Sequence, residues 1–246
     1  MPTPLDSLHQ PLNAAIIGAS GGIGGALVRL LLSFYGVHHV YGLSRRLVDV
    51  QDRRYEPLVI DYSDENTVAL AADAIDKPLD LVIVTTGFLH SDQLQPEKSF
   101  GQISMDTMTH NMLVNTIGPS LVAKHLLPKM RRDHKTVFAA LSARVGSISD
   151  NRLGGWYAYR ASKAALNMMI KTFAVELGRR QPQTIIAGLH PGTVDTGLSK
   201  PFQRNVPSEK LFSPAFSAQC LLEVVDSLGI TDSGSCFAWD GQKIPE

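Results

Sequence analysis

The sequence is poor in cysteine, with only Cys220 and Cys236 among its 246 residues. Two cysteines give neither a disulfide framework nor the ligand spacing of a metal site, which fits a reducing compartment. The formal net charge is zero, and the basic residues fall in scattered pairs rather than in one stripe. This distribution argues against nucleic acid as a partner.

The amino-terminal stretch, residues 1–13, has early prolines and no apolar run. It therefore lacks the pattern of a signal peptide or a membrane anchor, and we expect a cytoplasmic protein with no membrane partner. His38 and His39 adjoin, but no companion spacing indicates a metal site.

What the chain has is a regular alternation of short apolar runs and longer helical patterns. Strands are predicted at 14–17, 37–43, 58–61, 79–85, 136–141, 184–189 and 235–239, and helices at 23–34, 67–75, 105–115, 120–130, 157–179 and 214–228. Asp64 is the expected N-cap of the second helix. With no linker or repeat, the pattern predicts one α/β domain over 1–246, a Rossmann-like doubly wound parallel sheet flanked by helices.

Two segments stand apart from this alternation. Residues 1–12 form an amino-terminal extension, and residues 193–213 form a long irregular stretch with Pro201 and Pro207 after a strand. Loops of that length are commonly functional, so we expect a substrate lid at 193–213, with a plain surface excursion as the alternative.

The glycine-rich turn from Gly18 to Gly24 follows the first predicted strand and opens the first helix. At this place in an open parallel sheet, backbone amides and a helix N-terminus bind phosphate. The spacing differs from G-x-G-x-x-G, and a simple strand-to-helix connection is the alternative. The second strand ends in Ser44, Arg45 and Arg46, whose hydroxyl and guanidinium groups suit a 2′-phosphate, so NADPH is predicted over NADH. Arginines that only face solvent are the alternative there.

Tyr159 and Lys163 are one turn apart on the predicted helix 157–179. Residues at i and i+4 share a helix face, so the ammonium is expected to lower the tyrosine pKa from about 10. That would give a proton donor for use near neutral pH. Six tyrosines make this spacing easy to obtain by chance, so its weight depends on its surroundings.

The glycine turn and the Tyr-Lys pair together resemble the classical short-chain dehydrogenase/reductase family over nearly the whole chain. Further pieces lie in the order of that family: Asp61, Thr85-Thr86-Gly87, Asn115 before Gly118-Pro119, and Pro191-Gly192-Thr193-Val194-Asp195-Thr196. The stretch 144–159 is similar to the branch of C-factor-like proteins and small carbonyl reductases.

The resemblance implies an NADPH-dependent oxidoreductase that transfers hydride between the nicotinamide and a small carbonyl or alcohol substrate. It implies cofactor contacts at Gly18, Ser20, Gly22, Ile23, Gly24, Asp61, Tyr62, Thr86, Gly87, Pro191, Gly192, Val194 and Thr196. Asp61 would accept from the adenine amino group, and a turn carboxylate is the alternative for it.

The resemblance also assigns catalytic roles. Tyr159 is the acid, Lys163 lowers its pKa and binds the nicotinamide ribose, and Asn115 holds a relaying water. Asn111 competes for that last role, but Asn115 has the family's spacing to Gly118.

The family's catalytic serine falls at Ala143 in this chain. Three explanations are open: a bulge that turns Ser142 inward, Ser147 or Ser149 reaching back, or a site that works without the hydroxyl. We expect Ser142 to fill the role. Ala143 also motivates an alternative function, a cofactor-binding signalling or regulatory protein of the C-factor-like type with little catalysis.

The predicted helix 157–179 is too apolar for one that covers only its own sheet. Because the family pairs this helix between subunits, we expect a homodimer or homotetramer. A helix deeply buried within a monomer is the alternative.

Overall fold

The computed structural model describes residues 5–246, and its centre is an eight-stranded sheet with the order β10-β9-β6-β5-β4-β1-β2-β3. The strands are β1 Leu12–Ile17, β2 Val37–Ser44, β3 Tyr55–Val59, β4 Leu81–Val84, β5 Thr136–Leu141, β6 Thr184–His190, β9 Ser235–Ala238 and β10 Lys243–Ile244. All pair in parallel except β10, which runs antiparallel to β9. This confirms the predicted doubly wound α/β fold.

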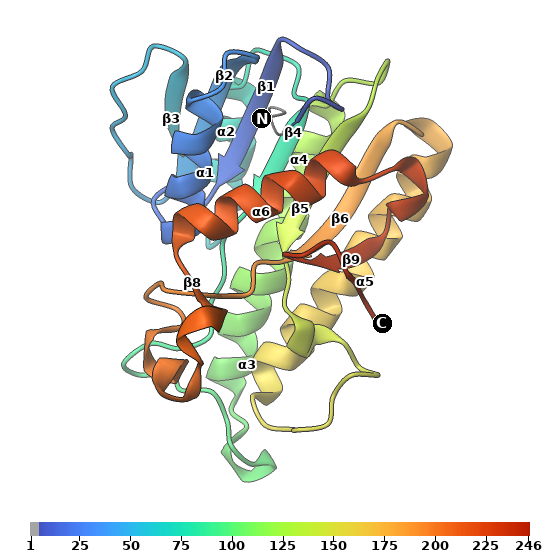
Figure 1. Cartoon of the computed structure of the whole chain (residues 1–246). Helices are drawn as coiled ribbons and strands as arrows, with labels where there is room; N and C mark the ends of the chain where they lie inside the picture. The colour runs from blue at the N-terminus through green and yellow to red at the C-terminus, as the bar shows by residue number, and fades with distance from the viewer. Residues whose placement is uncertain (1–4) are drawn as a thin grey trace.

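Helices cover both faces of the sheet (Figure 1). Alpha helices are α1 Gly22–Leu32, α2 Glu65–Ala74, α3 Met105–Met112, α4 Gly118–Leu126, α5 Tyr157–Arg180 and α6 Pro214–Ser227. One apolar core lies between the sheet and α1 and α6, and a second lies on the other face under α2, α4 and α5. Strands covered on both faces explain the nearly continuous apolar runs in the sequence.

Most predicted elements lie within a few residues of their observed bounds, and the Asp64 side chain caps α2 as expected by accepting from Asn66 N. The strand predicted at 58–61 is wrong by three residues, because β3 begins at Tyr55 and includes Pro57. An edge strand tolerates this proline, since its missing N–H takes nothing from an inner ladder.

Two further differences concern the connections. The helices predicted at 105–115 and 120–130 are joined by a π-helical turn, Leu113–Ile117, without a break in the chain's helical course. The irregular stretch after β6 contains two short strands, β7 Thr193–Val194 and β8 Leu211–Phe212, which pair with each other in a separate small sheet.

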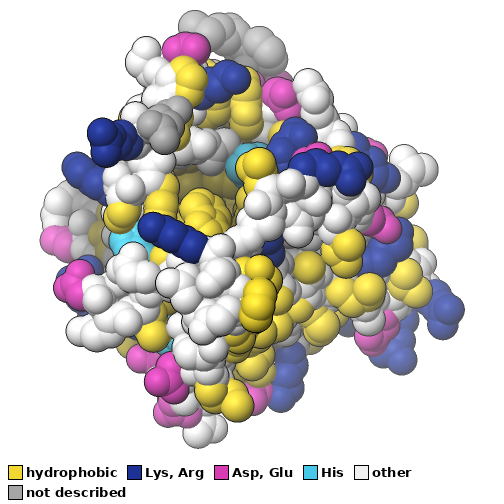
Figure 2. All heavy atoms as spheres, turned by 90° about the horizontal axis from the view of Figure 1, so that it is seen from below, with side chains coloured by type: hydrophobic (Ala, Val, Ile, Leu, Met, Phe, Trp, Pro, Cys, Tyr) yellow, Lys and Arg dark blue, Asp and Glu magenta, His cyan; other side chains and the backbone are white. Residues whose placement is uncertain are grey.

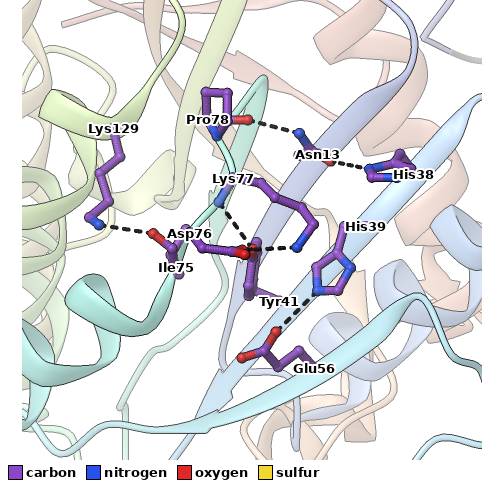
Figure 3. A network of polar contacts seen from close by, with 10 residues as sticks. All are labelled: Asn13, His38, His39, Tyr41, Glu56, Ile75, Asp76, Lys77, Pro78 and Lys129. Atoms are coloured by element: carbon purple, nitrogen blue, oxygen red, sulfur yellow. Dashed lines mark hydrogen bonds and ion pairs between the residues drawn. The ribbon is translucent and has the colours of Figure 1, made fainter.

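A polar network at the amino-terminal edge of the sheet accounts for His38 and His39 (Figure 3). His38 Nδ1 lies 3.1 Å from Asn13 Oδ1, and His39 Nε2 lies 3.3 Å from Glu56 Oε2. The two histidines thus tie β2 to β1 and to β3. Within residues 5–246, no group of histidine, cysteine or acidic side chains could hold a metal ion.

No helix in the described range has the length and apolar character needed to cross a membrane.

Candidate active site

A hollow lies at the edge of the sheet where the parallel strands end. Figure 2 views the molecule from this side and shows hydrophobic side chains on the floor of the hollow, with histidine and basic side chains around it. The carboxyl ends of parallel strands are where open α/β sheets bind their ligands. The sequence motifs singled out above all follow these strand ends.

The glycine turn packs so closely that side chains would not fit. Gly18 has φ +88°, and a Cβ there would lie 2.6 Å from Thr85 Oγ1, while a Cβ on Gly24 would collide with the Gly18 carbonyl. A Cβ on Gly22 would lie 2.8 Å from Thr196 Cγ2. The amino-terminus of α1 is therefore bare backbone, suited to phosphate, and it abuts the segment after β7.

Asn115 lies in the π-helical turn and is fully buried. Its Oδ1 accepts from Phe88 N at 2.8 Å, and its Nδ2 donates to Phe88 O at 2.8 Å and to Ser162 Oγ at 3.0 Å. The side chain thus fastens the loop after β4 to α5. A π-helical turn inside a helix is frequently a feature of functional sites.

Lys163 and Gly87 meet beside this asparagine. A Cβ on Gly87 would lie 3.7 Å from Asn115 Oδ1 and 3.9 Å from Lys163 Nζ. Lys163 is 2% exposed, and its Nζ donates to Leu141 O at 2.8 Å. The structure therefore brings three of the predicted site residues together at the end of β4 and β5.

Tyr159 shares the face of α5 with Lys163, whose Nζ lies 5.8 Å from the centre of the phenol ring. Burial raises the pKa of Tyr159 to about 12 and lowers the pKa of Lys163 to about 7. The predicted lowering of the tyrosine pKa is thus wrong for this arrangement. Both groups are removed from water, which favours their neutral forms.

The structure gives the Ser142 hydroxyl a partner away from Tyr159. The β5–β6 register continues without a bulge to Leu141, and the Ser142 hydroxyl donates to Asn167 Oδ1 at 2.6 Å. Asn167 is two helical turns beyond Tyr159, about 12 Å along the helix axis. The Ser142 hydroxyl is therefore turned towards the middle of α5 and not towards the phenol.

The other two serines are engaged as well. Ser147 Oγ accepts from Asp150 N at 3.2 Å and lies 3.5 Å from Ser149 Oγ. Ser149 Oγ donates to Glu246 O. The hydroxyls of Ser142, Ser147 and Ser149 thus all have partners within the protein, and the three explanations for Ala143 stay open.

At the end of β2, the side chains of Arg45 and Arg46 have different neighbours. Ser44 is buried and donates to Arg46 O at 2.6 Å, so its hydroxyl closes the turn. Hydrogen bonds from Ser63 N and Ser63 Oγ lower the pKa of Asp61, and the positive charge of Arg45 adds to this lowering. Arg46 instead lines a pocket of about 450 Å³ beside the glycine turn, together with Ser20 and Arg29 of α1.

The Asp61 and Tyr62 side chains both have partners within the protein. Asp61 Oδ1 accepts from Ser63 N and from Ser63 Oγ. This oxygen therefore acts as a turn carboxylate, which is the alternative given above for Asp61. Tyr62 Oη lies 2.9 Å from Thr86 Oγ1. Its ring packs on Gly118 of α4, where a Cβ would collide with it.

The segment after β6 forms one wall of the hollow. Gly192 has φ +77°, and Val194 is buried, its carbonyl accepting from Ser199 Oγ. Phe202 packs against the rings of Trp156, at 5.1 Å, and His90, at 5.4 Å. The proposed lid is therefore in contact with the loop after β4 and with the start of α5.

Sequence reasoning missed three residues here. Arg29 lies on the helix after the glycine turn, where a basic residue carries no positional signal. His90 and Glu97 lie in the loop after β4, far in sequence from the groups they contact. Glu97 accepts from Ala158 N at 3.2 Å across 61 positions, and no local pattern indicates such a contact.

Comparisons with known proteins agree with this architecture. The short chain dehydrogenase family model matches residues 12–207. The chain is 32% identical over 147 residues to the C-signal protein of Myxococcus xanthus, covering 60% of this chain and 83% of that protein. It is 33% identical over 189 residues to 1-hydroxy-2-glutathionyl-2-methyl-3-butene dehydrogenase of Rhodococcus sp. (strain AD45), covering 76% of this chain and 77% of that protein.

Two solved structures share the fold. The NADPH-bound carbonyl reductase from chicken fatty liver has a TM-score of 0.81 and 22% identity, with 95% of this chain and 98% of that chain covered. The carbonyl reductase Sniffer of D. melanogaster also has a TM-score of 0.81 and 22% identity, covering 97% and 100%. With most of its length matched by the family model, the chain belongs to the short-chain dehydrogenase family of NAD(P)-dependent oxidoreductases.

Proposed function

We propose that this protein reduces a carbonyl compound with NADPH, in a site where Tyr159 supplies the proton. The observation that carries the proposal is the convergence of Lys163, Asn115 and Gly87 below Tyr159, at the strand ends and next to a bare glycine turn. The test is direct: the purified protein should oxidise NADPH in the presence of members of an aldehyde and ketone panel. NADPH binding without oxidation across the panel would refute it.

The chain's residues would divide the work in the following way. Bound NADPH supplies the hydride, held by the glycine turn at one end and by Val194 and Thr196 at the other. Tyr159 donates its proton to the carbonyl oxygen as this becomes an alkoxide. Lys163 would bind the nicotinamide ribose. Asn115 would fix the loop after β4 through Phe88 and would hold the water that relays a proton to the lysine.

The phenol pKa favours one direction of this reaction. With a pKa of about 12, Tyr159 is protonated throughout the neutral range and can always donate. An alkoxide is a stronger base than a phenolate, so the transfer from Tyr159 to the product oxygen is downhill. Alcohol oxidation would need the tyrosinate, which is scarce at neutral pH, and we therefore propose that oxidation is slow at neutral pH and becomes faster as the pH rises towards 12.

The lysine pKa leads to a prediction on cofactor affinity. A Lys163 pKa of about 7 means that the ammonium is charged below pH 7 and neutral above it. Because a charge-assisted hydrogen bond is stronger than a neutral one, NADPH should bind about tenfold more weakly at pH 9 than at pH 6.5. Fluorescence titration of NADPH measures this. NADH, which has no titrating 2′-phosphate, should show the same slope, and equal affinities at the two pH values would contradict the proposed contact.

Arg46 is the residue that we propose for 2′-phosphate recognition, in the pocket it shares with Arg29 and Ser20. Arg46→Ala should raise the KM for NADPH about tenfold and leave that for NADH unchanged, since it removes one charge-assisted contact. Arg45→Ala tests the original sequence-based choice and should have the smaller effect. Arg53→Ala, an exposed arginine outside the pocket, is the matched control. A larger effect at Arg45 would reverse the assignment.

The substrate side of the hollow is aromatic. The rings of Trp156, Phe202 and His90 contact one another in series, and Phe88 packs edge-on against His110 at 4.2 Å. This lining supports a small substrate with an apolar or aromatic group beside its carbonyl. Asp61 Oδ2 and the Thr86 and Gly87 backbone would serve the adenosine end of the cofactor.

Ala143 supports a second candidate, a cofactor-binding regulatory protein with little catalysis. The occupied Ser142 hydroxyl strengthens it, because neither residue then polarises a carbonyl. A cellular effect that persists in a Tyr159→Phe variant would favour this function.

The outer face of α5 supports the proposed homodimer or homotetramer. Met168 and Val175 are 65% and 55% exposed, and Ile117 nearby is 46% exposed. Covering these side chains between copies would remove apolar area from water.

A further inference from the structure

Three consecutive residues in the left-handed region precede the first turn of α5. Gly154, Gly155 and Trp156 have φ values of +63°, +67° and +52°. Glycine adopts this conformation freely, but for a bulky residue such as tryptophan it is strained. Such strain persists only where the surrounding structure holds the residue in place.

Glu97 supplies that hold. Its carbonyl accepts from Trp156 N at 2.6 Å, and its carboxylate Oε2 accepts from Ala158 N at 3.2 Å. Within residues 5–246, the Trp156 side chain accepts no capping hydrogen bond at the start of α5. The first turn of this helix also contains no acidic residue. A residue from the loop after β4 thus accepts the hydrogen bond that an N-cap side chain accepts elsewhere.

The held tryptophan forms part of the site. Its indole lies edge-on to Tyr159, with ring centres 6.2 Å apart, and edge-on to Phe202 at 5.1 Å. The amide that Glu97 binds belongs to Ala158, the residue directly before Tyr159. The two bonds to Glu97, called the clamp below, therefore hold the backbone at Trp156 and Ala158, three residues and one residue before Tyr159.

The remaining oxygen of Glu97 indicates that the contact serves position. Glu97 is 2% exposed, and among residues 5–246 its buried Oε1 has no hydrogen-bond partner. A buried polar atom without a partner is unfavourable, and such atoms are uncommon in native proteins. The hydrogen bonds that Oε2 and the backbone carbonyl of Glu97 accept offset this unfavourable free energy.

We propose that Glu97 is a positioning residue for Tyr159, acting through Trp156 and the first turn of α5. The inference rests on the proposed reductase activity, in which Tyr159 donates the proton. Glu97 holds the phenol at the angle needed for transfer and holds the indole against the lid segment.

The kinetic test compares Glu97→Ala with Glu97→Gln. Glu97→Ala should lower kcat about tenfold with the NADPH Kd unchanged, because the turn relaxes while the cofactor site stays intact. Glu97→Gln should retain kcat within threefold, since the amide oxygen can accept from the same N–H. Asp80→Asn is the matched control: it replaces a fully buried carboxylate that accepts from Asn13 N, at the opposite edge of the sheet, and should lower the Tm without changing kcat.

A second readout does not depend on turnover. In a Trp239→Phe background, Trp156 is the remaining tryptophan. Glu97→Ala keeps the backbone bond to Trp156 N and removes the carboxylate bond to Ala158 N, so the first turn of α5 should relax. The Trp156 emission should then shift to the red and the indole should become more accessible to acrylamide, whereas both should be unchanged in Glu97→Gln.

The outcomes separate the two proposals. Absence of reductase activity in the unaltered protein refutes the proposed function, and the emission of Trp156 then still decides whether the clamp exists. Unchanged kcat and emission in Glu97→Ala overturn the inference. A kcat loss that Glu97→Gln does not restore overturns it too, because it would assign the effect to charge.

Discussion

Replacing Tyr159 with phenylalanine is expected to lower kcat for carbonyl reduction about 10³-fold, within the range that general acid catalysis contributes. The change removes the proton donor and keeps the ring that packs on Trp156. The NADPH Kd should stay within threefold, since the cofactor contacts proposed above come from other residues. Steady-state kinetics and fluorescence titration measure the two quantities.

Tyr157→Phe is the matched control for this variant. Tyr157 begins the same helix, two residues before Tyr159, and should keep kcat within twofold after the same loss of a hydroxyl. If Tyr159→Phe retained more than a tenth of the activity, the phenol would not be the acid.

Restoring a serine at position 143 is expected to raise kcat by ten- to hundredfold. Ala143 is half-buried, with extended backbone (φ −149°, ψ 147°), directly before the short helix Arg144–Gly146. A preorganised donor to a developing oxyanion is worth about 10²–10³ in rate, and an added hydroxyl should recover part of this. Comparison of kcat for Ala143→Ser and the unaltered protein on one carbonyl substrate tests it.

Ser142→Ala accompanies this experiment. Because the Ser142 hydroxyl donates to Asn167, its removal should change kcat less than threefold. A tenfold loss in Ser142→Ala, together with no gain in Ala143→Ser, would return the polarising role to Ser142.

The sequence predicted the parallel sheet and its helices well because buried strands leave long apolar runs and the glycine turn has a fixed place between β1 and α1. It predicted poorly where elements are short. β7 and β8 each have two residues, too few for any periodicity, and β3 carries Pro57, a residue that ordinarily argues against a strand.

In the site, too, the sequence predicted properties that depend on neighbouring residues better than properties that depend on the whole fold. The pairing of Tyr159 with Lys163 follows from helix spacing, but their pKa values follow from burial, which depends on the whole fold. The direction of Ser142 depended on whether β5 contains a bulge, and its partner Asn167 is 25 residues away. Glu97 is further still from the helix that it caps, so no spacing pattern includes it.

The carboxamide of Asn115 imitates a neighbouring strand. Its Oδ1 accepts from the Phe88 N–H and its Nδ2 donates to the Phe88 C=O, as the backbone of a strand partner would, although β4 ends at Val84. The loop after β4 on that side of the hollow is thus fixed by the same pair of hydrogen bonds that a neighbouring strand would provide. The 193–213 side is held by ring contacts and by His90, whose Nε2 lies 3.2 Å from Gly197 O. We therefore expect this wall, rather than the Asn115 side, to move when a substrate enters.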